Sequence, residues 1–167
     1  MISQNYAPGD RWLVYCSDSE HLREVREDLE GLDLDLLEYH SQDSGNHEAT
    51  LNYFTNRGGV LLAIKCLDEG IDIPLINRAL ILASSTNPRE YVQRRGRVLR
   101  RTPGKYSSRI FDVLVVGDDG RAITPSEVVR AMEFAGDARN VGASIYLESL
   151  LAPGAVAAGR PLDIEED

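Results

Sequence analysis

Arginines are concentrated in one short part of this chain, between Arg89 and Lys105. Seven cations and a single anion, Glu90, fall in this window, whereas the whole chain of 167 residues carries a net charge of −9. A guanidinium keeps its charge and presents a rigid fork of donors that matches phosphate oxygens. A solvated basic helix face is the alternative interpretation, but the spacing Gln-Arg-x-Gly-Arg-x-x-Arg favours a phosphate site. Its defined positions are Gln93, Arg94, Gly96, Arg97 and Arg100.

A second candidate motif begins where the apolar run Leu61–Ile64 ends, and it reads Glu-Gly-Ile-Asp-Ile-Pro up to Pro74. Gly70 permits a backbone conformation or a close approach that a side chain would forbid. Asp72 can accept hydrogen bonds from a ribose hydroxyl or orient an arginine. Taken alone, an ordinary turn explains this motif better, since glycine and aspartate are common turn residues. Its order and spacing relative to the arginine segment favour a functional role.

Apolar runs alternate with helical patterns along the first part of the chain. The predicted strands are 11–16, 34–40, 60–64, 79–83 and 109–116. Ser17 and Glu20 have capping-box spacing for a helix that Gly31 stops, and Ser44-Gly45-Asn46 can cap a helix that ends at Gly58-Gly59. Asn87-Pro88 begins the arginine helix. This alternation predicts an α/β fold with a parallel sheet, helices on both faces and ligand-contacting loops at the carboxyl ends of the strands.

The pattern changes after Gly117–Gly120. We predict a sheet-bearing core over 1–117, a helical extension over 118–151 that opens at Thr124-Pro125, and a tail or linker over 152–167. The two cysteines and three histidines lack metal-site spacing, so no metal site is predicted and the thiols are expected to be reduced. No apolar run is long enough to span a membrane and no signal pattern is present, so we expect a cytoplasmic protein without a membrane partner.

In this order and spacing, the two motifs resemble motifs V and VI of superfamily-two helicases. Leu13–Ser17 resembles motif IV, and the likeness extends over roughly Arg11–Val116. It is closest to the branch that contains DEAD/DEAH-type, restriction-enzyme and DNA-repair helicases. The resemblance implies a RecA-like C-terminal motor domain. Such a domain works with the N-terminal RecA-like domain of the same protein and binds single- or double-stranded nucleic acid, which we expect to be DNA.

The same resemblance implies roles for individual residues. Arg97 and Arg100 match arginine fingers, which stabilise charge on a transferring γ-phosphoryl group. Nucleotide contacts would come from Gly70, Asp72, Gln93 and Arg94. Many relatives have threonine where this chain has Ile64, so contacts to nucleic acid are expected from other residues, namely Ser17, Lys65, Ser84 and Ser85.

Half of an ATPase site is missing from the sequence. There is no Gly-x-x-x-x-Gly-Lys-Ser/Thr phosphate loop and no Asp-Glu-x-His or Asp-Glu-x-Asp segment after a strand. We therefore expect ATP and Mg²⁺ to be bound mainly by an N-terminal motor domain, and the isolated chain to be inactive. The alternatives are a noncatalytic binding or regulatory module with a helicase-like fold and a standalone phosphate-binding α/β protein. The presence of both Arg97 and Arg100 favours the motor domain.

Overall fold

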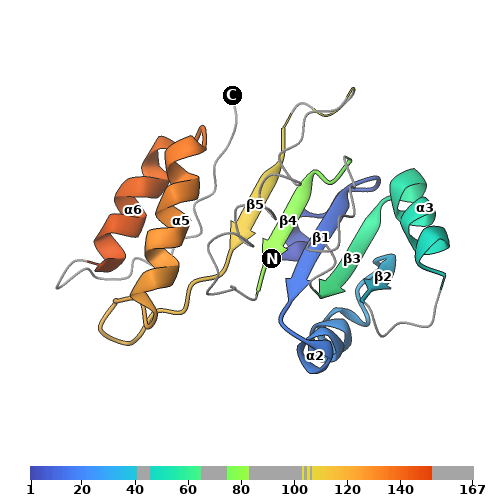
Figure 1. The fold of residues 1–167 in the computed structure, drawn as a ribbon, viewed down its shortest axis with the longest axis horizontal. Coiled ribbons are helices and arrows are strands. Elements are labelled where there is room, and N and C mark those ends of the chain that lie inside the picture. The colour runs from blue at the N-terminus through green and yellow to red at the C-terminus, as the bar shows by residue number, and fades with distance from the viewer. Residues whose placement is uncertain (41–45, 65–74, 83–102, 104, 106, 152–167) are drawn as a thin grey trace. The chain divides into compact units, whose positions relative to one another are not determined.

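A parallel sheet organises the first part of the chain. The computed structural model describes residues 1–40, 46–64, 75–82, 103, 105 and 107–151. Within them the strands are β1 (Arg11–Cys16), β2 (Leu36–Tyr39), β3 (Gly59–Ile64), β4 (Arg78–Ile81) and β5 (Arg109–Asp112). The strand order is β2-β3-β1-β4-β5, and every neighbouring pair is parallel (Figure 1). β1 is therefore the central strand.

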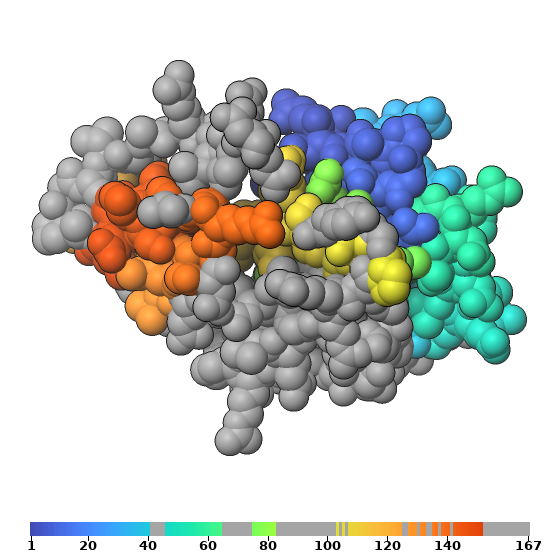
Figure 2. Space-filling view, turned by 90° about the horizontal axis from the view of Figure 1, so that it is seen from above, coloured from blue at the N-terminus to red at the C-terminus, as the bar shows by residue number. Residues whose placement is uncertain are grey.

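Helices α2 (Ser19–Leu29) and α3 (His47–Arg57) connect the first three strands, and the short helix α1 (Ile2–Asn5) precedes β1. The chain moves outward across the sheet from β1 to β2 and returns from β2 to β3. Right-handed crossovers in opposite directions place α2 and α3 on opposite faces. α3 forms an outer surface of this part of the molecule (Figure 2). The predicted α/β fold class is confirmed.

The two faces of β1 are both buried, which is the pattern of a central parallel strand. Trp12, Leu13 and Val14 have no solvent exposure. On the α2 face, Trp12 stacks on Phe111 of β5, with ring centroids 5.2 Å apart. Alternate residues of β1, including Leu13 and Tyr15, face the other side of the sheet. The sheet therefore has apolar side chains on each face. The core on the α2 face includes Ile2, Trp12, Val14, Cys16, Leu22, Val60, Leu62 and Leu80.

The structure corrects some predicted boundaries. Asp18, not Ser17, caps α2, because its carboxylate accepts the backbone N–H groups of Glu20 and His21. Asn46 caps α3 as predicted, accepting from the backbone N–H of Ala49 at 3.0 Å. The second strand is shorter than predicted and spans Leu36–Tyr39. The predicted arginine helix lies outside the described residues.

The chain divides into two compact units, Met1–Asp112 and Val113–Asp167. The second unit contains α5 (Pro125–Asp137) and α6 (Val141–Leu151), whose core is formed by Val128, Ala131, Ala135, Ala143, Leu147 and Leu150. Leu114 and Val116 pack against this core, and so β5 ends at Asp112 instead of the predicted Val116. The functional boundaries predicted at residues 117 and 151 stay predictions.

Gly58 offers a test of how closely the end of α3 approaches the start of β1. Its φ is +87°, and an added Cβ would lie 2.6 Å from the carbonyl oxygen of Asp10. Gly31 is a suitable control, because its φ is +95° but a Cβ there meets nothing within 4 Å. We expect Gly58→Ala to lower the free energy of unfolding by about 1–3 kcal/mol more than Gly31→Ala. Chemical denaturation of both variants measures the difference, and equal losses would contradict the close approach.

Candidate functional site

The carboxyl ends of three neighbouring strands meet at one edge of the sheet. Cys16, the last residue of β1, pairs in register with Ile64, the last residue of β3. On the other side, Tyr15 pairs with Ile81 of β4, and its carbonyl accepts the N–H of Leu82 at 3.3 Å. Cys16, Ile64 and Leu82 thus lie at the same edge of the sheet. In parallel α/β folds this edge is where ligands bind.

Most of the predicted site residues belong to the two segments that leave this edge on either side of β1. Lys65, Gly70 and Asp72 follow β3, and they lie outside the described residues. The same is true of the predicted residues that follow β4, namely Ser84, Ser85, Gln93, Arg94, Arg97 and Arg100. The structure brings together the starting points of both segments, and the roles of these residues stay predictions.

Ser17 is the predicted site residue that the structure describes, and its polar hydrogens are already engaged. The Ser17 hydroxyl donates to Asp18 Oδ2 at 2.8 Å, and the Ser17 backbone N–H donates to Nδ1 of His21 at 3.3 Å. The hydroxyl oxygen also lies 3.0 Å from the same His21 nitrogen. A phosphate contact by Ser17 would have to replace its bond to an anionic carboxylate. Its predicted role in binding nucleic acid stays a prediction.

Two ionisable groups beside Ser17 have displaced pKa values. The backbone N–H of His21, the Ser17 hydroxyl and the Glu20 N–H together lower the pKa of Asp18, since all donate to its charged form. Burial, together with the charge of Asp18, raises the pKa of the Cys16 thiol to about 12. Cys16 is therefore a neutral, buried thiol at physiological pH and offers no thiolate for chemistry at this edge.

A cluster of polar residues holds the opposite, amino-terminal edge of the sheet, and sequence reasoning did not find it. Asp10 is 6% exposed, and its carboxylate accepts from Asn77 Nδ2 at 2.8 Å and from the Ala7 N–H at 3.0 Å. Asn77 Oδ1 in turn accepts from the Arg11 N–H at 2.8 Å. Arg78 Nε lies 3.7 Å from Asp10 Oδ2. No local pattern signals the contacts that Asn77 makes with Asp10 and Arg11, because these partners are far apart in sequence.

Within the part of the chain that the structure describes, no group of three or more His, Cys, Asp or Glu side chains could hold a metal ion. Mg²⁺ prefers oxygen ligands such as carboxylates, and the Asp18 carboxylate at this edge already accepts from N–H and O–H donors. Among the helices that the structure describes, none is long and apolar enough to cross a membrane.

The five-stranded parallel sheet, in the order β2-β3-β1-β4-β5, is that of a RecA-like α/β domain. The family described as the helicase conserved C-terminal domain matches residues 1–102 of this chain. The chain belongs to this family.

Similar proteins include ATP-dependent helicases. The ATP-dependent RNA helicase HAS1 of Saccharomyces cerevisiae is 31% identical over 101 residues, which is 59% of this chain and 20% of that protein. HAS1 of Candida albicans is 29% identical over 118 residues, covering 70% of this chain and 19% of that protein. The chain thus spans about a fifth of the length of the curated relatives it matches.

Solved structures show the same fold. The C-terminal part of the Fun30 ATPase domain superposes with a TM-score of 0.57 at 16% identity, covering 84% of this chain and 46% of that one. Domain 2 of the DEAD-box helicase Mss116p, solved bound to an RNA duplex, gives a TM-score of 0.55 at 19% identity, with 78% and 48% covered. At these identities the likeness concerns the fold.

Asp18 allows a test of the start of α2 through pH. Because its folded pKa is lowered, its contribution to stability is complete above the ordinary aspartate pKa, about 3.9, and is lost as the pH falls through the folded value. Asn caps a helix without titrating in this range. We therefore expect the difference in unfolding midpoint between the native chain and Asp18→Asn to change below about pH 4 and to be constant above pH 5. A flat difference across this range would show that Asp18 is not the cap.

Proposed function

We propose that this chain is the second motor domain of an ATP-dependent helicase or translocase that moves on nucleic acid. The observation that carries the proposal is the shared carboxyl edge of β3, β1 and β4, from which the segments bearing Gly70 and Asp72 and bearing Arg97 and Arg100 both depart. Membership of the helicase C-terminal family supports it. In such a motor the first domain would bind ATP and Mg²⁺, and this chain would complete the site.

In this proposal the arginines act on charge that develops during phosphoryl transfer. Arg97 and Arg100, in the helix predicted after β4, would contact the γ-phosphate held by the first domain, where a planar fork can contact two oxygens at once. Gln93 and Arg94 contact the nucleotide or support the interdomain contact, and Gly70 and Asp72 shape the loop that faces it. Alone, the chain would have at most trace ATPase activity, because it lacks the groups that hold the phosphates and Mg²⁺.

The nucleic acid would lie along the same edge, contacted by Ser17, Lys65, Ser84 and Ser85 and by the first domain. From the motifs we predict DNA and a place near the repair and restriction branch. The relatives HAS1 and Mss116p carry names or titles that refer to RNA. We therefore propose a nucleic-acid strand as the substrate class and test both types.

Substitution of the arginines in the full-length motor tests the proposed chemistry. We expect Arg97→Ala and Arg100→Ala each to lower kcat for ATP hydrolysis by roughly 10³–10⁵-fold, the range for arginine fingers. Nucleotide affinity should change much less, since the contacts form in the transition state. Lysine should rescue poorly because it lacks the planar fork.

Arg101→Ala is the matched control, because Arg101 is in the same cluster but outside the motif spacing. Its kcat should stay close to that of the unmodified motor. Steady-state kinetics and equilibrium nucleotide binding on all three alanine variants separate the possibilities. Equal, modest losses at the three positions would mean that the cluster is only a basic surface and that the finger assignment is wrong.

The isolated chain should bind single-stranded nucleic acid weakly and in a salt-sensitive way. Its net charge is −9, so attraction comes from a few local cations, and affinity should fall steeply with salt as counterions compete. Fluorescence anisotropy with labelled DNA and RNA oligonucleotides of the same length and sequence measures both affinity and preference. Tight binding that does not change between low and high salt would contradict the proposed phosphate contacts.

A further inference from the structure

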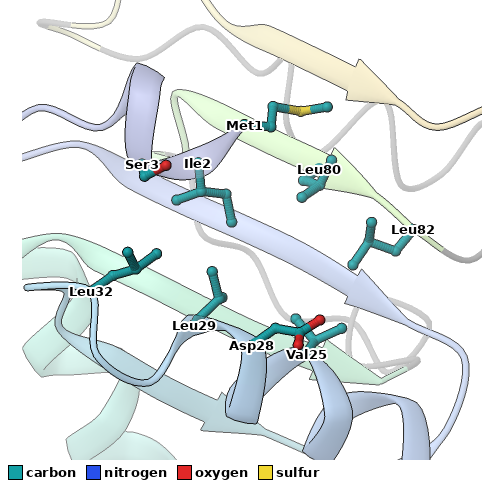
Figure 3. Close-up of a pocket in the computed structure, with 9 residues that line it drawn as sticks. All are labelled: Met1, Ile2, Ser3, Val25, Asp28, Leu29, Leu32, Leu80 and Leu82. Carbon is teal, nitrogen blue, oxygen red and sulfur yellow. The ribbon is translucent and has the colours of Figure 1, made fainter.

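An apolar groove lies between α1, α2 and β4, on the α2 face of the sheet (Figure 3). Its cavity has a volume of about 320 Å³. Leu80 of β4 and Ile2 of α1 are nearly buried in it, each 5% exposed, whereas Leu32 and Met1 are 38% and 53% exposed. Val25, Leu29 and Leu82 complete the apolar lining. We call it the α2 groove. Large exposed apolar side chains gathered around one cavity are a feature of binding surfaces.

The border of the α2 groove is acidic. Asp28 lines it, and Glu24 lies one helical turn earlier on the same side of α2. Between Asp18 and Glu30 the chain has six carboxylates and two arginines. Both arginines already pair with other carboxylates: Arg23 with Glu20 and Glu27, and Arg26 with Glu30 and Glu38.

Asp28 is not explained by the stability of α2. Across the described residues it makes no hydrogen bond or ion pair, and it occupies the last turn of the helix, where the dipole disfavours a negative charge. An exposed acid in an unfavourable helical position, beside an unfilled apolar groove, has a physical use if a cation comes from outside. The acidic border and the apolar groove therefore both suit a ligand that has apolar groups beside positive charges.

We propose that the α2 groove binds a basic amphipathic segment of a partner protein. Leucine- or phenylalanine-sized side chains would enter the groove between Leu29 and Leu82, and lysine or arginine residues beside them would pair with Asp28 and Glu24. Binding of an amphipathic helix in an apolar groove is a common mode of peptide recognition. The proposal does not depend on the proposed motor function, because none of the predicted ATP or nucleic-acid residues lines the groove.

Titration of the ¹⁵N- and methyl-labelled full chain with short synthetic peptides tests this by NMR. The probe has leucines on one helical face and lysines beside them. One control peptide has glutamates in place of the lysines, and another has the probe's composition in scrambled order. The lysine peptide should shift the signals of Leu29, Leu32 and Leu82 and bind at least tenfold more tightly than either control. Equal affinity for all three peptides would overturn the proposal, as would absence of binding at millimolar concentration.

Two exposed substitutions in the groove and one elsewhere locate the contact. Asp28→Lys should lower the affinity for the lysine peptide about fivefold or more, because an exposed ion pair is lost and a repulsion is added. Leu32→Ser should lower the affinity for the same peptide about tenfold, because less apolar surface is buried on binding. Glu148→Lys, on the exposed side of α6, makes the same change in net charge and should leave affinity within twofold. Equal effects of the two lysine substitutions would show that bulk charge alone attracts the peptide.

The same sample distinguishes other occupants of the groove. If contacts between Leu82 methyl groups and α5 or α6 appear in the peptide-free chain, then the second unit fills the groove and the proposal is wrong. If sedimentation shows a dimer that Leu32→Ser converts to a monomer, then the occupant is a second copy of this chain. A monomeric chain with an open groove that discriminates among the three peptides supports a basic partner segment.

Discussion

The hydrogen bond between Asp10 and Asn77 joins the starts of the central strands, and the alignment of the sheet depends on it. Asp10 joins β1 to β3 through its carbonyl, which accepts the Gly59 N–H at 2.9 Å, and to the start of β4 through its carboxylate. The Asn77 carbonyl accepts the N–H of Arg109, the first residue of β5, at 2.9 Å. One polar cluster around the buried Asp10 thus connects the starts of four strands. Because the Asp10 side chain is buried, leaving its carboxylate unpaired would be costly.

Alignment at the amino ends determines what meets at the carboxyl ends. Parallel strands rise about 3.3 Å per residue, so strands that start in register reach the opposite edge in register when they are similar in length. This is why Cys16 and Ile64 end together and why Leu82 bonds to Tyr15. The polar cluster acts at the end of the sheet away from the candidate site, and its effect on function is to position the segments that begin there.

The sequence was sufficient for the fold class and for several boundaries, because these follow from local patterns. β1 and the start of α3 coincide with an apolar run and with a capping asparagine. Local patterns gave the wrong boundary where two possible capping residues were adjacent, and where tertiary packing determined the end of a strand. Ser17 and Asp18 can both cap a helix, and the carboxylate of Asp18 takes two N–H groups while Ser17 bonds to it. The apolar run after Asp112 looks like more strand, but Leu114 and Val116 pack on the α5–α6 core.

The sequence predicts which residue types belong to the candidate site and in which order they occur. It says less about how they are arranged in space. The motifs identify arginines that suit phosphate, and the sheet explains why their segments start near each other. The contact between Asp10 and Asn77 joins residues 67 positions apart, so no short-range pattern could reveal it. The α2 groove was missed for a similar reason, since its lining comes from α1, α2 and β4.

Charge is distributed unevenly along this chain. The sequence from Arg89 to Lys105 is strongly cationic, while α2 is acidic and is capped by Asp18 at the same edge as Ser17. An anion brought to this edge therefore meets repulsion from Asp18 unless nearby cations compensate for it, and this favours phosphate binding shared with a second domain over binding by this chain alone. The far end of α2 has the opposite requirement. Asp28 lies about 14 Å along the helix from its first residue, and there it and Glu24 would attract cations at the groove. In these proposals, a single acidic helix disfavours anions at one end and attracts basic partners at the other.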